Sequence, residues 1–202
     1  MHPDLQLESG CFFIMLSLSS LQNTKQDRPA AVLGGGPSLP EDLKTIQAFT
    51  KNAKTTVLIA VNYHAHVIGI NADFMVYNDD PETDPAGMMA RAIEEFEGIK
   101  VSLDTATSDV YMDADYWEGM YSSNLATWFA DWLGCAPIYL CGMDCYQGNR
   151  VYCHDYVHDT PVFHYKLDDH LRIWQEEGIH KLRIEVIQAV SGPLQRIFGG
   201  VQ

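Results

Sequence analysis

Ala-Ala-Val-Leu-Gly-Gly-Gly-Pro-Ser-Leu-Pro-Glu-Asp-Leu, residues 30–43, is the stretch that decides the fold. Its first four residues are apolar and few enough to form a buried central strand. Gly34, Gly35 and Gly36 follow; they can adopt positive φ and, because they lack a Cβ atom, they leave their backbone N–H groups open to a ligand. The stretch therefore predicts a strand, a turn accessible to another molecule, and then a helix.

The start of that helix is marked by several residue types. Ser38 is a candidate N-cap, Glu41 three residues later completes a capping box, and Pro40 falls in the first turn. The free N–H groups of such a helix point back at the glycines and suit an anion, above all a phosphate. The alternative is a tight turn without a ligand, since the stretch contains neither G-x-G-x-x-G nor a phosphate loop with Gly-Lys-Ser/Thr.

Length and charge limit the functional classes. The 202 residues suit one domain, with residues 1–28 as an N-terminal extension or edge strand and residues 29–202 as a Rossmann-like nucleotide-binding domain. The formal net charge is −14 and the pI about 4.7. Such a chain has no broad basic surface for nucleic acid or anionic membranes, whereas a few N–H groups could still hold a nucleotide.

Cysteines and the N-terminus indicate a cytoplasmic protein. The five cysteines are odd in number and show no framework spacing, so reduced, buried thiols are expected. No apolar run is long enough to span a membrane, and the apolar residues 11–18 lack the preceding positive charge of a signal peptide. Residues 11–16 could form an edge strand, or a strand added across a subunit contact in a homo-oligomer.

Strands and helices are expected to alternate along the chain. Buried strands are predicted at 30–33, 55–61, 73–77, 99–103, 137–140 and 181–187, and helices at 41–51, 85–97, 122–133, 168–178 and 191–198. This order predicts an α/β fold, a single domain with a mostly parallel sheet covered by helices on both faces.

Polar residues follow several of these strands directly. The glycine turn, Asn62, Asn78 and Asp144 each come just after a predicted strand. In open α/β sheets ligands bind at the carboxyl ends of the strands, so these positions are expected to converge on one site. Asp144 is also a catalytic candidate, because a carboxylate after a buried strand must be paired or used.

Five segments, in the same order along the chain, carry a resemblance to known families. Residues 33–39 (Leu-Gly-Gly-Gly-Pro-Ser-Leu), 59–62 (Ile-Ala-Val-Asn) and 69–76 (Gly-Ile-Asn-Ala-Asp-Phe-Met-Val) resemble the DUF115 family. That family includes the archaeal 6-hydroxymethylpterin diphosphokinase (MptE-like) and the bacterial motility accessory factors. Residues 121–126 (Tyr-Ser-Ser-Asn-Leu-Ala) and 133–146, with their Gly-Met-Asp-Cys-Tyr ending, resemble the same family and are equally similar to bacterial sialyltransferases that use CMP-sialic acid.

The resemblance covers roughly residues 30–190 and implies roles for individual positions. It implies nucleotide phosphate or ribose at Gly34, Gly35, Gly36, Pro37 and Ser38; phosphate at Asn62; the sugar or leaving group at Asn78; the base or phosphate at Ser122 and Ser123; and pocket walls at Asp144 and Tyr146. In the sialyltransferases a late histidine is the general base, and His158 and His164 lie in the corresponding region without a clean match.

Three functions remain open at this stage. The favoured one is glycosyl transfer from a nucleotide sugar of the CMP-sialic acid type, without a metal. The second is an ATP-dependent diphosphokinase acting on a pterin-like molecule, for which Asp79 and its acidic neighbours could hold Mg²⁺. The third is a non-catalytic binding or assembly protein that keeps the fold. The ligand in the first two is a small nucleotide or nucleotide sugar.

Overall fold

The computed structural model describes residues 16–49, 55–84, 87–112, 121–147, 151–155, 166–178 and 182–201. The strands in these ranges are β1 (Ala30–Leu33), β2 (Val57–Val61), β3 (Phe74–Tyr77), β4 (Ile99–Ser102), β5 (Val110–Tyr111), β6 (Ile138–Cys141) and β7 (Ile187–Ala189). The helices are α1 (Leu18–Leu21), α2 (Leu39–Phe49), α3 (His64–Val67), α4 (Met88–Glu95), α5 (Ser122–Trp132), α6 (Leu167–Ile173) and α7 (Gln195–Phe198). Further helical turns occupy Pro81–Thr83, Trp174–Gly178 and Ile184–Val186.

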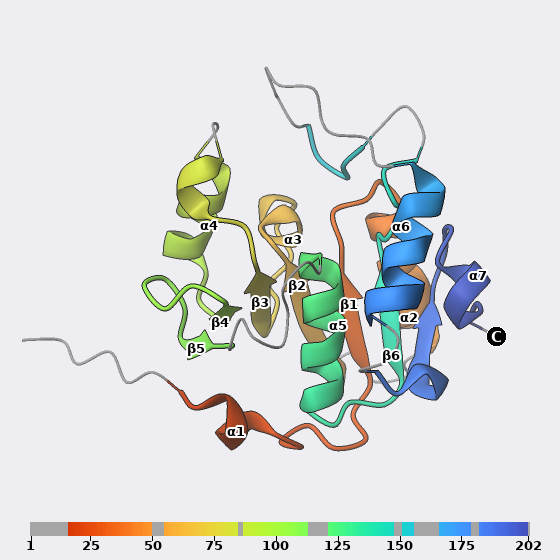
Figure 1. Cartoon of the computed structure of the whole chain (residues 1–202), viewed down its shortest axis with the longest axis horizontal. Helices are drawn as coiled ribbons and strands as arrows, with labels where there is room; N and C mark the ends of the chain where they lie inside the picture. The colour runs from red at the N-terminus through yellow and green to blue at the C-terminus, as the bar shows by residue number, and fades with distance from the viewer. Residues whose placement is uncertain are drawn as a thin grey trace, which may run out of the picture.

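The seven strands of the described chain form one sheet in the order β5-β4-β3-β2-β1-β6-β7 (Figure 1). Every neighbouring pair runs parallel. β1 lies between its two partners in register, so that Ala30 is opposite Val57 on one side and Ile138 on the other. This arrangement confirms the predicted single α/β domain with a parallel sheet.

Alternate residues of each strand enter two different cores. On β1, Ala30 and Val32 face one core, and Ala31 and Leu33 face the other. The first core is closed mainly by α5, and the second by α2, α3 and α4. In Figure 1, α5 lies in front of the sheet and α2 lies behind it. Both faces are covered, as the continuous apolar strands require.

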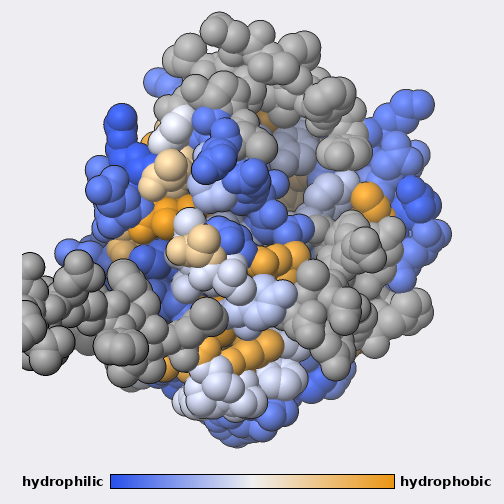
Figure 2. Space-filling model, turned by 60° about the vertical axis from the view of Figure 1, so that its left-hand side comes forward, coloured by the Kyte–Doolittle hydropathy of each residue, from blue (hydrophilic) through white to orange (hydrophobic). Residues whose placement is uncertain are grey.

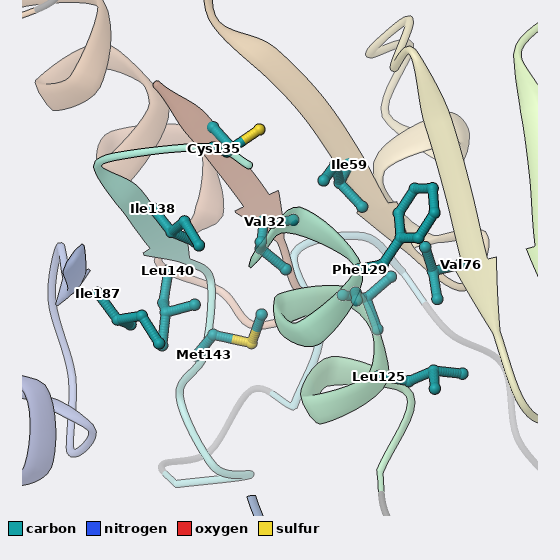
Figure 3. Packing of buried hydrophobic residues seen from close by; sticks show 14 of the residues in the cluster. Val32, Ile59, Val76, Leu125, Phe129, Cys135, Ile138, Leu140, Met143 and Ile187 are labelled. Carbon is teal, nitrogen blue, oxygen red and sulfur yellow. The ribbon is translucent and has the colours of Figure 1, made fainter. Parts of the chain in front are cut away.

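The helix α5 supplies the largest packing surface on its face of the sheet. Figure 3 shows Ile59 and Val76 pointing from neighbouring strands toward Phe129 of α5. Phe129 is fully buried and meets Phe74 edge-on, with ring centroids 5.1 Å apart. This packing fixes α5 against the centre of the sheet and therefore fixes where its N-terminus lies.

The last strand is displaced from its predicted position. A strand is predicted at residues 181–187, but Ile184–Val186 form a 3₁₀ turn and β7 begins at Ile187. Ile184 is 48% exposed, so its hydrophobicity does not reflect burial in the sheet. The short elements α3 and β5 were not predicted, because four and two residues are too few to show a period.

Only the end of the expected N-terminal extension is described. Leu16 forms an isolated parallel bridge with Val110 of β5, and its N–H donates to the carbonyl of Asp109 at 2.8 Å. The rest of the predicted edge strand at 11–16 lies outside the described residues. The segment after it contains α1.

The surface of the described chain is mostly polar. Its exposed large hydrophobic side chains are Leu16, Val67 and Ile184. On the face drawn in Figure 2, hydrophobic residues form small groups separated by hydrophilic ones. Within the described ranges, no helix is both long and apolar enough to cross a membrane.

Candidate functional site

The sheet reverses its direction of growth between β1 and β6. From β1 the chain moves outward through β2, β3, β4 and β5, and α5 then returns it to the opposite side of β1. Loops diverge at such a point and leave a crevice at the carboxyl ends of the strands. A cavity of about 280 Å³ lies there. Its lining includes Gly34, Gly35, Gly36, Asn62, His64, Asn78, Asp79, Tyr121, Ser122, Ser123, Asp144, Tyr146, Tyr152 and His170.

The backbone of the glycine turn is largely engaged within the protein. The N–H of Gly34 donates to the carbonyl of Cys141, and that of Gly36 to the carbonyl of Gly142, both at 2.8 Å. Gly35 is half-buried, and its carbonyl accepts from the N–H of Cys153. Two of the three N–H groups expected to face a phosphate are therefore already hydrogen bonded.

The glycines are required by close packing. None of the three adopts the left-handed φ that glycine permits. Instead, a Cβ on Gly36 would lie 2.0 Å from Oδ2 of Asp144, and one on Gly35 would lie 2.4 Å from Cδ2 of His64. The structure therefore uses the absent Cβ of these glycines, which allows close contact with neighbouring loops, and does not use their freedom to adopt positive φ.

Ser38 joins two carboxylates beneath the cavity. Its hydroxyl lies 2.9 Å from Oδ2 of Asp144 and 3.0 Å from Oδ2 of Asp42, and its N–H donates to Asp144 at 3.0 Å. Burial raises the pKa of the Asp42 carboxyl, although the N–H of Gly142 donates to it and opposes that shift. The Ser38 hydroxyl has one proton and can donate to only one of the two carboxylates. When Asp42 carries a proton, Asp42 donates to Ser38 and Ser38 donates to Asp144, so both contacts are hydrogen bonds.

This geometry changes the expected role of the turn. Pro37 and Ser38 do not line the cavity, and Ser38 faces the carboxylates of the protein in place of a ligand. The expected capping box is absent from the described contacts, because Glu41 pairs with Lys44 instead. Asp144 holds the turn after β1 against the loop after β6.

A second polar group forms where β2, β3 and α5 meet. Asn62 Nδ2 donates to Oδ2 of Asp79 at 2.7 Å, and the Ser122 hydroxyl approaches the same oxygen at 3.4 Å. The N–H of Asn78 donates to the Ser122 hydroxyl at 3.2 Å. Asn62 and Asn78 thus converge as the strand-end pattern predicted, and Ser122 and Ser123 on the first turn of α5 lie beside them.

Backbone strain is concentrated at this cavity. Asn62, Cys145 and Tyr146 have φ of 53°, 52° and 56° and all line it. Left-handed φ is uncommon for residues other than glycine and costs roughly 1–3 kcal/mol at each position. Only two further non-glycine residues of the described chain, Asn23 and Asp27, share this conformation. Such strain gathers at functional sites, where the surrounding structure holds it in place.

Aromatic rings build one wall next to Gly35. Nδ1 of His64 lies 2.9 Å from Nε2 of His154, a hydrogen bond buried from solvent. His64 also stacks on Tyr152, with centroids 4.6 Å apart and planes 19° from parallel. Burial, with a smaller contribution from His154, lowers the pKa of His64 to about 3. The His64 ring is therefore neutral at physiological pH.

A second histidine faces the cavity from α6. His170 stacks on Tyr121 with ring centroids 4.5 Å apart and lies 5.2 Å from the ring of Tyr146. Burial lowers the pKa of His170, and the nearby carboxylate of Asp169 opposes that shift. A neutral imidazole at this position can accept a proton from a bound molecule.

The structure brings together most, but not all, of the predicted site residues. The cavity lining includes Gly34, Gly35, Gly36, Asn62, Asn78, Ser122, Ser123, Asp144 and Tyr146. His158 and His164 lie outside the described residues. Sequence reasoning did not select His64, Tyr152 or His170 for the site, although His64 follows Asn62 by two positions, a weak but usable signal.

The acidic loop after β3 has local structural roles. Asp80 accepts from the N–H of Glu82 at 2.9 Å, and Asp84 accepts from the N–H of Met89 at 2.8 Å. In the described part of the chain, no group of three or more His, Cys, Asp or Glu side chains is arranged to hold a metal ion. Capping of neighbouring helical turns explains these two carboxylates.

Comparison with known proteins gives structural relatives only. No protein-family model matches the chain, and no curated protein does. The MAf glycosyltransferase from Magnetospirillum magneticum AMB-1 is similar at 20% identity and a TM-score of 0.45. That match covers 73% of this chain, which spans only 30% of the Magnetospirillum protein.

A second relative matches along nearly its whole length. It is the sialyltransferase CstII from Campylobacter jejuni, in a complex with the substrate analogue cytidine-5'-monophosphate. The identity is 15%, the TM-score 0.56, and the match covers 88% of this chain and 86% of that one. A complex of the same enzyme with CMP-3FNeuAc gives 14% identity, a TM-score of 0.56 and 87% coverage of both chains. At these identities the likeness establishes the α/β fold.

Proposed function

We propose that this chain is a nucleotide-dependent transferase whose cavity binds a nucleotide sugar of the CMP-sialic acid type. The observation that carries the proposal is the convergence of Asn62, Asn78 and Ser122 on a cavity at the reversal point of the sheet. The volume of about 280 Å³ is near the lower end, roughly 300 Å³, of small-molecule sites. The cavity therefore suits one nucleotide-sized ligand.

The fold supports the cytidine monophosphate class. The Campylobacter sialyltransferase shares the architecture over most of both chains and binds CMP and CMP-3FNeuAc in its structures. The resemblance of residues 121–126 and 133–146 points to the same group of enzymes. In this proposal Asn62, Asn78, Ser122 and the first turn of α5 hold the phosphate, and Tyr146 lines the sugar side.

The charges of the cavity favour a monophosphate over a triphosphate. Asp79 and Asp144 both line it. Each carboxylate repels a phosphate chain, and the repulsion grows with the number of phosphate charges. The ATP-dependent diphosphokinase is therefore the weaker candidate. A third alternative, a protein that binds the nucleotide without catalysis, must be distinguished from both enzymes by experiment.

In this proposal the proton acceptor is one of the late histidines. His158 and His164 remain candidates from the sequence, and His170 joins them because its neutral ring faces the cavity. In glycosyl transfer, a base removes the proton of the acceptor hydroxyl as that oxygen attacks the sugar, while the nucleotide leaves with the bonding electrons. Substitution of each histidine by glutamine identifies which one performs this step.

A thermal-shift panel tests the ligand class. CMP, CDP, UMP, AMP and ATP, each with and without Mg²⁺, are compared on the full chain. A ligand at a hundred times its Kd adds about 2.7 kcal/mol of stability, which raises Tm by roughly 5–10 °C in a protein of this size. We expect CMP to give the largest shift, independent of Mg²⁺; stabilisation by ATP alone would favour the diphosphokinase.

A pair of variants links binding to the cavity. Asn62→Gly removes the amide while keeping the left-handed backbone, and Asn23→Gly is its control at a φ of 57° on an exposed loop. We expect Asn62→Gly to lose most of the CMP shift and the release of CMP from a CMP-sugar, and Asn23→Gly to retain both. CMP binding without release of CMP across a panel of acceptors would support the non-catalytic alternative.

A further inference from the structure

Two helices begin at the cavity, and each has a carboxylate of the protein at its N-terminus. At α2, Oδ2 of Asp144 accepts from both the N–H and the hydroxyl of Ser38. At α5, Oδ2 of Asp79 accepts from the Ser122 hydroxyl and from the Asn62 amide. A helix N-terminus attracts negative charge because its first N–H groups lack partners within the helix. Both carboxylates therefore lie where an anionic group of a ligand would be stabilised.

The two carboxylates differ in how firmly they are held. Asp144 is partly buried and receives two bonds of 2.9 and 3.0 Å from Ser38, and its Oδ2 fills the space beside Gly36. Asp79 is exposed and holds one bond of 2.7 Å and one long contact of 3.4 Å. Asp79 can therefore rotate into solvent and leave the cavity, whereas Asp144 is part of its floor.

Asp79 engages the groups that the proposed function assigns to phosphate. Those groups are Nδ2 of Asn62 and the hydroxyl of Ser122, the first residue of α5. The first turn of α5 contains no acidic residue and no side chain caps it, so Asp79 supplies the negative charge beside it. Oδ1 of Asn62 is buried without a hydrogen-bond partner, which leaves Nδ2 as the end of the amide that an anion contacts.

We propose that Asp79 is a resident anion, meaning a carboxylate of the protein that occupies the phosphate position of the cavity until a ligand phosphate replaces it. This inference rests on the proposed function and identifies the residue that sets the affinity for the phosphate. When the phosphate binds, Asp79 loses its hydrogen bonds with Asn62 and Ser122. Its negative charge nevertheless remains close to the ligand. Asp79 therefore weakens binding of a nucleoside monophosphate but leaves binding of an uncharged nucleoside unchanged.

Charge neutralisation at Asp79 tests the idea. Asp79→Asn keeps the size and shape of the side chain but removes the charge. The control is Asp80→Asn, which removes the same charge one residue away; Asp80 lies outside the cavity lining and caps a turn, a role that asparagine also performs. Titration calorimetry at low salt measures the Kd of CMP and of cytidine for the wild type and both variants, and circular dichroism verifies that each is folded.

The expected result is a Kd for CMP that is roughly three- to tenfold lower in Asp79→Asn than in the wild type, the range for one partly screened charge and its displaced hydrogen bonds. Asp80→Asn should match the wild type, and cytidine should bind all three alike. An unchanged or higher Kd for CMP in a folded Asp79→Asn overturns the resident anion while leaving the proposed function intact. CMP binding to neither the wild type nor any variant overturns the proposed function itself.

Discussion

The buried His64 imidazole predicts a specific loss of stability in mild acid. The folded protein lowers the pKa of His64 from 6.5 to about 3, mainly through burial. Below pH 6.5 the unfolded chain binds a proton on this ring that the folded protein does not bind. The stabilisation is therefore complete above pH 6.5 and is lost as the pH falls toward 3.

The size of the effect follows from that difference in pKa. Each pH unit between the two values changes the free energy of unfolding by about 1.4 kcal/mol. Acidification from pH 7 to pH 5 should therefore cost about 2 kcal/mol through His64 alone. Domains typically have total stabilities of roughly 5–15 kcal/mol, so this is a measurable fraction.

Urea unfolding at pH 7, 6 and 5, followed by tryptophan fluorescence, measures this slope. His64→Asn places an amide near the position of Nδ1 and cannot titrate, so its stability should fall about 2 kcal/mol less than that of the wild type over this range. His66→Asn, on the same short helix, removes a histidine that pairs with Glu95 at the surface and should keep the His64 slope. Equal slopes in the wild type and His64→Asn would refute the reasoning.

Three more substitutions test the packing around the site. Gly36→Ala places a Cβ 2.0 Å from the Asp144 carboxylate and should lower the free energy of unfolding in urea by about 2–4 kcal/mol. Gly200→Ala is the control: its Cβ meets only the flexible Gln195 side chain, at 3.1 Å, and should change the free energy of unfolding little. Asp42→Asn should be at least as stable as the wild type at pH 7. Burial raises the pKa of Asp42, so the folded wild type is stabilised by the proton on Asp42 at low pH and loses this stabilisation as the pH rises through the raised pKa. A variant less stable than the wild type at pH 7 would contradict this. Phe129→Ala should cost about 3–5 kcal/mol in urea, and a loss below about 1 kcal/mol would show that α5 is not anchored by this ring.

Local patterns were sufficient to predict the fold. The apolar run at 30–33 and the later runs predicted β1, β2, β3, β4 and β6 to within two residues, because central parallel strands are apolar on both faces. The run at 181–187 misled the prediction because its β-branched residues form a turn at the surface. β-Propensity describes a residue type, whereas burial depends on the rest of the chain.

The site was predicted as a location but not as a set of contacts. The rule that strand ends converge placed the glycine turn, Asn62, Asn78 and Asp144 together, and all of them line the cavity; Ser122 was selected through the family resemblance. The bond between His64 and His154 joins positions 90 residues apart, and that between Asn62 and Asp79 joins positions 17 apart. Such pairs depend on how side chains are oriented after the sheet assembles, which no local pattern in one sequence records.

The order of strands also limits when the cavity can exist during synthesis. One wall belongs to the loops after β1, β2 and β3, whereas the opposite wall follows β6, which docks beside β1 only after α5 has been made. A nascent chain that has emerged through β5 therefore offers a nucleotide no enclosed place to bind. A metabolite can rescue a poorly folding variant only after translation has passed Leu194, the last described residue of the lining, by trapping the completed molecule, and it cannot serve as a template for the earlier steps.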